Sequence, residues 1–174
     1  AKGRPQAIPG SRVAEQRVEY DAGGRVLSKT NFSAEGYRTD DLDGVARTEF
    51  TYDAAGRLES TTFRNADGEV CVPHRPGYAR QVISYDALGR PLEIRHLDAA
   101  GKLIANTRGE QLVQFAYDDV HHTSTRRNMV DGALADNVDG VAVQREERTQ
   151  DAATLRRSWY NAAGQSVPGA PQQV

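Results

Sequence analysis

Short segments that alternate apolar and polar side chains recur along the chain. Val18 and Tyr20 flank one polar residue, and the same pattern appears in 50–52, 83–85 and 113–117. A period of two residues is typical of half-buried antiparallel strands. Helical periodicity is nearly absent, and 131–140 has room for one short helical turn at most. The pattern predicts an all-β chain.

The alternating segments belong to a repeat. A Tyr-Asp pair begins at Tyr20, Tyr52, Tyr85 and Tyr117, at spacings of 32, 33 and 32 residues. A further step of 33 residues reaches Asp151, which lacks the preceding Tyr. Internal repeats of this length indicate stacked supersecondary units. We therefore expect five copies of one unit.

Each copy contains two turns of similar composition. Its first turn reads "DAGG", "DAAG" or "DALG", and a second glycine follows the first turn glycine after twelve residues in the first three copies. The Asp side chain accepts a backbone hydrogen bond two residues on, and the Gly supplies the positive φ of a bulged hairpin. Each copy should hold two or three strands, and neighbouring copies should share a continuous apolar face.

The predicted architecture is tandem antiparallel β-hairpin repeats that form an elongated or curved, solenoid-like sheet. We expect one domain over 1–174, with copies at about 10–43, 44–76, 77–108, 109–139 and 140–171. The fifth copy resembles a terminal cap, since Glu146, Arg148 and Gln150 replace apolar residues and discourage further strand addition.

Composition excludes several classes of protein. A net charge of −2 gives no general affinity for nucleic acid, and no apolar run approaches the roughly 18 residues of a membrane helix. The single cysteine, Cys71, excludes an internal disulfide. The first residue is Ala1, which suits a mature exported protein or a trimmed one.

The segments "YDAGGRVL", "YDAAGRLES" and "YDALGRPLE" resemble the Tyr-Asp repeats of bacterial Rhs proteins. The matching positions in the second copy are Tyr52, Asp53, Gly56, Arg57 and Leu58. The resemblance implies a curved β scaffold without catalysis, periplasmic, secreted or at the cell surface. The second turn lengthens the unit here, and five copies are too few to enclose a cargo, so we expect a related variant.

The acidic turns and the Cys/His residues offer little for catalysis. "NADGEV" and "DDLDG" gather carboxylates but do not complete a calcium loop. Cys71 and His74 form a C-x-x-H pair without a second pair at zinc spacing. We expect no metal, no cofactor and no enzyme. An enzyme that brings these two residues together with His96 or with 121–122 remains a less favoured alternative.

The fourth copy breaks the turn pattern. In "DDVHHTSTRRN" the expected glycine position holds His121, beside His122, and Arg126 and Arg127 follow. Repeats depart from their local rule at functional sites or under structural pressure. The segment is either a binding patch for an acidic partner, pH-sensitive through its histidines, or drift in an exposed turn.

Other candidate contact residues lie outside that turn. Arg57 and Arg90 recur after the first turn and form either a stripe for acidic groups or a solvated face. Trp159 and Tyr160 either anchor a partner or close the end of the core.

The favoured function is a scaffold or binding module that engages another protein through its sheet. The alternative is a carbohydrate or cell-envelope binding module, which would need an exposed column of tyrosines.

Overall fold

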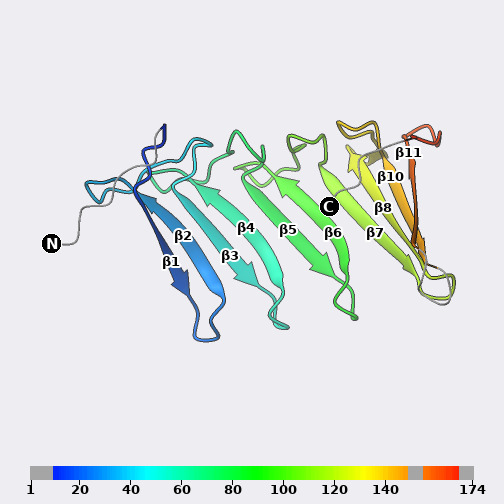
Figure 1. Cartoon of the computed structure of the whole chain (residues 1–174), viewed down its shortest axis with the longest axis horizontal. Coiled ribbons are helices and arrows are strands. Elements are labelled where there is room, and N and C mark those ends of the chain that lie inside the picture. Colours follow the sequence, from blue (N-terminus) through cyan, green and yellow to red (C-terminus); the bar gives the residue numbers. More distant parts are fainter. Residues whose placement is uncertain (1–9, 149–154, 169–174) are drawn as a thin grey trace. The chain divides into compact units, whose positions relative to one another are not determined.

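The computed structural model describes residues 10–148 and 155–168 of the chain. Within these ranges the chain forms eleven β-strands and no helix, so the prediction of an all-β chain is confirmed (Figure 1). The chain divides into two compact units. The first ends at Val82 and takes in Leu97–Lys102, and the second contains Ile83–His96 and continues from Leu103. This division runs through the third copy, and the five copy boundaries stay a prediction.

The first unit is an antiparallel sheet whose strands follow chain order. The strands are β1 (Glu15–Tyr20), β2 (Val26–Phe32), β3 (Arg47–Tyr52), β4 (Leu58–Arg64) and the first half of β5 (Arg80–Tyr85). Each strand pairs with the next. The tight first turns lie at one end of the strands, and the second turns and connecting loops lie at the other (Figure 1).

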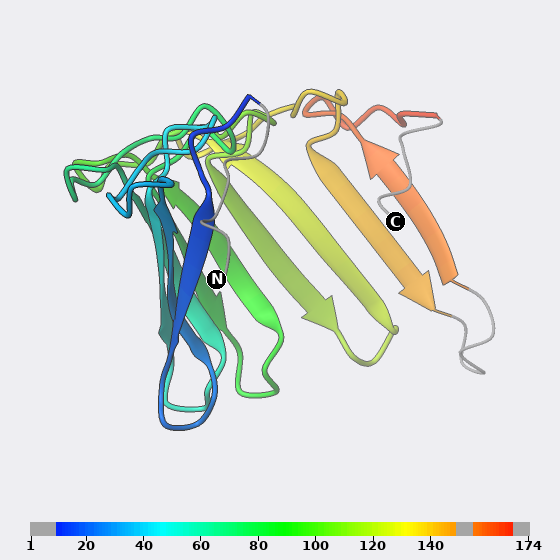
Figure 2. The same ribbon diagram turned by 60° about the vertical axis from the view of Figure 1, so that its left-hand side comes forward.

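The second unit repeats this arrangement (Figure 2). Its strands are the rest of β5, β6 (Pro91–Leu97), β7 (Leu112–Asp118), β8 (Thr123–Val130), β9 (Ala133–Leu134), β10 (Val143–Arg148) and β11 (Leu155–Tyr160). The order β6-β7-β8-β10-β11 is antiparallel throughout, and the two-residue β9 pairs with β8. Tandem antiparallel hairpins, as predicted, make up both units.

The first turns have the predicted bulged geometry. In the second copy, the N–H of Gly56 donates to the carbonyl of Asp53 at 2.9 Å, and the N–H of Asp53 donates to the carbonyl of Arg57 at 2.9 Å. The β3–β4 register shifts between Thr51 and Tyr52, and Gly56 has φ of 79°. Only glycine adopts this φ without a steric penalty, which explains its place in the motif.

The second turns form smaller hairpins than the first. Where the chain is described, single bridges join Phe32 to Arg38, Arg64 to Val70 and Tyr160 to Ser166, and the fourth copy extends its bridge into the strand β9. Each copy therefore has two full strands and at most a rudimentary third. The sequence allowed at most one helical turn in 131–140. The segment instead contains β9 and a turn.

The buried apolar residues gather where the connecting loops enter the strands. In the first unit these are the pairs Val45–Ala46 and Tyr78–Ala79, and in the second unit Val113 and the pair Val141–Ala142. Each of the pairs follows a turn glycine. The expected continuous apolar face along the strands is wrong in part, because Ser28, Thr30 and Thr62 are also buried there.

Ion pairs stabilise the polar face of the first unit. Arg47 on β3 donates to Glu19 on β1 at 2.9 Å and to Thr30 on β2 at 3.1 Å, so its side chain joins three strands. Arg64 on β4 donates to Glu49 on β3 at 2.7 Å. The chain has few large apolar side chains, so its core is small. Cross-strand pairs of this kind add to the stability that the core provides.

The fifth copy has a different register from the one that the Tyr-Asp spacing predicted. β10 ends at Arg148, eight residues after Gly140, just as Tyr117 lies eight residues after Gly109. Arg148 is therefore the counterpart of the repeated tyrosine. Asp151 and Gln150 lie outside the described residues.

Candidate functional site

The repeated aspartate caps its own turn. Oδ1 of Asp53 accepts hydrogen bonds from the N–H groups of Ala55 and Arg57, both at 2.9 Å, and Oδ2 accepts from Nε of Arg57 at 2.7 Å. The backbone N–H of Arg57 contributes most to lowering the pKa of Asp53, and the Arg57 guanidinium adds to it. Asp21 and Asp86 make the same bonds. The interpretation of the turn aspartates as hairpin caps is confirmed.

The repeated tyrosine joins one hairpin to the hairpin before it. The hydroxyl of Tyr52 donates to the backbone carbonyl of Val26 at 2.8 Å. The guanidinium carbon of Arg25 lies 4.9 Å from the centroid of the Tyr52 ring. Both partners of Tyr52 therefore come from the preceding copy, where they are adjacent in sequence.

The second unit contains the same two contacts, a tyrosine hydrogen bond and an arginine over the ring, which together we call the clamp. Tyr117 donates to the carbonyl of Pro91 at 2.9 Å, and the guanidinium carbon of Arg90 lies 4.2 Å from the Tyr117 ring centroid. At Tyr52 and Tyr117, the tyrosine of one copy and the turn arginine of the copy before it thus form a structural contact between neighbouring copies. The hydroxyls of Tyr52 and Tyr117 are engaged within the fold, whereas Tyr20 in the first copy is 59% exposed.

The fourth copy closes its first turn differently. Oδ2 of Asp118 lies 2.6 Å from Nδ1 of His121, so the imidazole stands where the turn arginine stands in other copies. The residue with left-handed backbone is His122, with φ of 51°. The expectation that His121 takes the glycine position is wrong, because β7 and β8 pair through Asp118 and Thr123 without a bulge and leave the four-residue loop 119–122.

An open groove runs over this altered turn. It lies on β7, β8 and β10, has a volume of about 380 Å³, and includes Tyr117, Ser124 and Glu146 in its lining. A second hollow of about 260 Å³ shares these three residues and adds Phe115 and Arg126. The lining of the first groove is acidic at Asp118, Asp119 and Glu146, and it also contains Arg90, Arg148 and the imidazole of His122.

Several of those charges already have partners in the second unit. Arg90 pairs with Asp86 of its own turn and with Asp119 of the next. Glu146 accepts from Nε of Arg157 at 2.8 Å. The groove therefore offers a partner a mixed surface of paired charges around an aromatic ring, and not a free basic patch.

A buried charge lies near the loop end of the same strands. Where other copies place Val45–Ala46, Tyr78–Ala79 or Val141–Ala142 after the turn glycine, the fourth copy places Glu110–Gln111. Glu110 is 6% exposed. Buried carboxylates require compensating partners. Glu110 is not among the site residues predicted above, although an alignment of the two residues after each of these glycines shows the departure.

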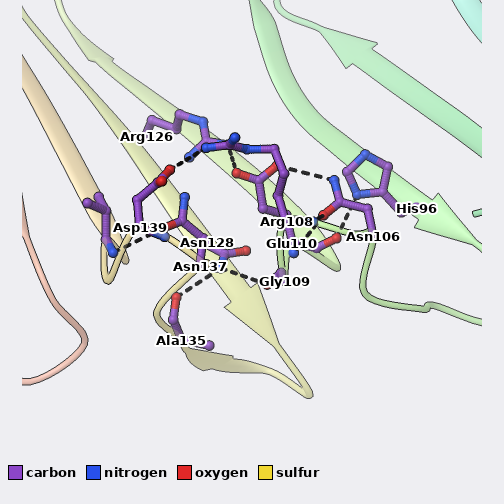
Figure 3. Close-up of polar contacts among 11 residues, drawn as sticks. His96, Asn106, Arg108, Gly109, Glu110, Arg126, Asn128, Ala135, Asn137 and Asp139 are labelled. Carbon is purple, nitrogen blue, oxygen red and sulfur yellow. Dashed lines mark hydrogen bonds and ion pairs between the residues drawn. The ribbon is translucent and has the colours of Figure 1, made fainter. Parts of the chain in front are cut away.

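Glu110 has partners on several elements (Figure 3). Arg126 on β8 donates to Oε1 at 2.6 Å, and Asn106 donates to Oε2 at 3.3 Å. Nδ1 of His96 on β6 is 2.8 Å from the backbone carbonyl of Glu110. The equivalent side chain in the first copy is Asn31, which donates to the carbonyl of Val45 at 3.0 Å. His96 thus retains a bond of the repeat, and Glu110 and Arg126 add an ion pair.

Burial and charge act on the pKa values of this cluster in different directions. Desolvation raises the pKa of Glu110, but Arg126 and the hydrogen bonds together outweigh it, and the pKa is lowered overall. Desolvation is the main cause that lowers the pKa of His96, and Arg126 adds to it. The neutral imidazole therefore donates from Nδ1 to the carbonyl of Glu110.

Neighbouring loops complete the cluster. The guanidinium of Arg108 pairs with the carboxylate of Asp139 (Figure 3). Asn128 is fully buried and donates to the carbonyls of Gly109 and Ala135 at 3.0 and 2.9 Å. The cluster is dense in hydrogen bonds, and we read it as the polar core of the fourth copy.

The predicted patch 118–128 divides between surfaces. Arg126 and Arg127 are adjacent on β8, so their side chains point to opposite faces of the sheet. Arg126 is bound to Glu110, while Arg127 is exposed and lines a hollow with Gln114 and Leu92. The four predicted residues do not form one contiguous basic patch.

The remaining candidates lie on β11 or in turns. Trp159 and Tyr160 are half-buried; the N–H of Val167 donates to the carbonyl of Trp159. Trp159 occupies the position that His96 holds in the third copy. Arg57, like Arg90, is held by the aspartate of its turn.

The side chain of Cys71 and the backbone of His74 both contact the loop at Asp43 and Gly44. The Cys71 thiol is half-buried and donates to the carbonyl of Gly44 at 3.5 Å. Desolvation, together with the charges of Asp40 and Asp41, raises its pKa. Within 10–148 and 155–168, no group of three or more His, Cys, Asp or Glu side chains is placed to hold a metal ion.

The structure, where it is described, has no helix that could cross a membrane. No protein-family model matches the sequence, and no curated protein matches it. Among solved structures, the chain is similar to part of the crystal structure of TcdB2-TccC3-TEV. The two are 18% identical with a TM-score of 0.42, and the match covers 87% of this chain and 8% of that chain. This chain therefore spans less than a tenth of that protein's length.

Proposed function

We propose that the chain is a non-catalytic β-repeat module that binds another protein through the surface of β7, β8 and β10. One observation carries the proposal. The altered turn of the fourth copy, with His122 in place of glycine, borders an open groove over these strands. Departures from a repeat's own rule concentrate at functional sites.

The state of Cys71 supports the non-catalytic part of the proposal. A nucleophilic cysteine acts as the thiolate, which a lowered pKa favours. The pKa of this thiol is raised instead, and its hydrogen bond runs to a backbone carbonyl. The Tyr-Asp motif supports assignment to scaffolds related to Rhs repeats, in an exported or surface-associated setting.

The engaged tyrosines favour a protein partner over a carbohydrate. Sugar-binding surfaces need aromatic faces that are free to stack against a ring. Tyr52 and Tyr117 are covered by Arg25 and Arg90 and use their hydroxyls on backbone carbonyls.

Site-specific photo-crosslinking tests the proposal. A photoreactive residue replaces Thr123 in the groove, and a control chain carries it at the exposed Thr51 of the first unit. After irradiation in the native host, mass spectrometry should identify one protein joined at 123 and not at 51. Arg148→Glu in the same chain should weaken the adduct. An equal yield from both positions, or capture of polysaccharide alone, would contradict the proposal.

A further inference from the structure

The strand β1 ends the first unit with one side unpaired. Within the part of the chain that the structure describes, β1 has a ladder only with β2. Its side chains are charged at Glu15, Arg17 and Glu19, but these groups contact their own sheet: Arg17 lies 4.1 Å from the Phe32 ring centroid. No described residue pairs with the outer backbone edge of β1, and an edge of this kind can accept another strand.

Tyr20 on this edge lacks the contacts that its counterpart makes. Tyr52 is covered by Arg25 and donates to Val26 of the preceding copy. Tyr20 is 59% exposed, and no hydrogen bond of its hydroxyl occurs among the described residues. Among the described residues, β1 therefore supplies the tyrosine of this contact between copies, and no arginine or lysine covers the ring.

The turn glycines show the same difference. A Cβ added to Gly56 would lie 3.2 Å from the guanidinium of Arg25, because that side chain rests against the turn. A Cβ added to Gly24 would meet nothing within 4 Å. The same holds for the second turns, where Gly68 lies beside Arg38 and Gly36 is open. Within residues 10–148 and 155–168, nothing therefore covers the turns at Gly24 and Gly36.

We propose that the outer edge of β1 binds the second strand of a Tyr-Asp hairpin from another polypeptide. The strand adds antiparallel, as β2 adds to β3. Its turn arginine covers Tyr20 and rests against Gly24, and the carbonyl that follows this arginine accepts the Tyr20 hydroxyl. The partner is recognised by an extended Gly-Arg segment, since the repeat itself shows these contacts at Tyr52 and Tyr117.

A second copy of this chain fits the edge less well. Among the described residues its last strand is β11, which pairs with β10 alone, and residues 149–154 join these two strands in sequence. That segment reads "TQDAAT" and contains no arginine. A head-to-tail dimer would therefore leave Tyr20 without its cation, so the occupant is a different hairpin that carries one.

Nuclear magnetic resonance titration of the full chain tests the proposal. The probe is the peptide GRVLSKTNF, the sequence of residues 24–32, which pairs with β3 in this fold. We expect amide shifts in β1 and at Gly24. A peptide with Arg replaced by Gln should bind about three- to tenfold more weakly, given the strength of a cation–π contact and a lost charge. Tyr20→Phe should weaken binding, whereas Tyr37→Phe, at another exposed tyrosine, should not.

Three results would overturn the proposal. The first is no shift in β1 or equal binding of both peptides. The second is dimerisation of the chain that perturbs β1 without peptide. The third is binding only by a chain that starts at Gly10, because residues 3–5 read Gly-Arg-Pro and would then be the natural occupant. The test concerns the first unit alone, so its failure leaves the groove of the second unit untouched.

Discussion

Arg126 donates to the carboxylate of Glu110 at 2.6 Å, and Glu110 stands at the position after the turn glycine that other copies fill with Val45, Tyr78 or Val141. The Glu110 side chain is 8% exposed and the Arg126 side chain is 25% exposed. A buried carboxylate of this kind is stable only while its partner remains. The fourth copy therefore depends on polar contacts where its neighbours depend on packing.

Removal of one partner should destabilise the protein more than removal of both. We expect Glu110→Gln to lower the free energy of unfolding by about 2 kcal/mol, below the range for fully buried pairs because Arg126 reaches solvent. Glu110→Val with Arg126→Ile introduces the residues found at Val45 and Ile94 and should recover most of that loss. Urea denaturation gives the free energy of unfolding of the unchanged protein, the single variant and the double variant. A double variant as unstable as the single one would contradict this account.

Acid should destabilise the second unit in two pH windows. The folded pKa of His96 is below its ordinary 6.5, so the unfolded chain takes up the proton first and stability falls as pH drops below about 6.5. The folded pKa of Glu110 is below 4.5, so its stabilisation is present above that pH and lost below it. Other groups face this cluster from the β6 and β8 strands and the loops, namely Arg126, Arg108 and Asp139.

His96→Phe separates the two windows, since Phe63 holds this position in the second copy. The variant should lose the upper part of the pH dependence of the unfolding midpoint and keep the lower part. Identical slopes between pH 5 and 7 in both chains would show that His96 does not titrate as described.

Two turn glycines should differ in their sensitivity to a Cβ. Gly24 and Gly56 have φ of 82° and 79°, so alanine at either position should cost about 1 kcal/mol from backbone strain. The Cβ of Gly56→Ala would also press the Arg25 guanidinium, at 3.2 Å, against the Tyr52 ring, so this variant should cost roughly 0.5 kcal/mol more. Thermal unfolding of the two variants gives the difference, and equal costs would argue against the clamp.

The hydroxyls of Tyr52 and Tyr20 should also differ in their contribution to the free energy of unfolding. Tyr52→Phe removes the hydrogen bond to Val26 and should lower the free energy of unfolding by about 1 kcal/mol. Tyr20→Phe is the matched control, with an expected change near zero because its hydroxyl is exposed. Denaturant titration of both chains would reveal whether the repeated tyrosine stabilises the repeat.

The four-residue loop of the fourth copy should accept glycine at one position only. His122 has φ of 51°, where a non-glycine residue is strained, so His122→Gly should stabilise the protein by about 0.5 kcal/mol after the entropic cost of glycine. Val120→Gly, in the same loop, should be destabilising. Reversal of these signs would place the left-handed residue elsewhere in the loop.

The sequence by itself determined the repeated turns of this protein. Asp53, Gly56 and Arg57 interact within five residues of one another, so the bulged hairpin follows from local hydrogen bonds and one positive φ. Alternation along each strand is equally local, and it predicted the all-β antiparallel fold. Local chemistry also predicted that the aspartates cap the hairpin turns.

Only the tertiary structure decided which side chains meet between copies. The Tyr52–Val26, Glu110–Arg126 and Arg108–Asp139 contacts join residues 16 to 31 positions apart, and they depend on which strands are neighbours and in what register. Strand register also separated Arg126 from Arg127 and moved the left-handed residue to His122. A shift of one residue reverses the face of a side chain, so spacing alone could not fix these relationships.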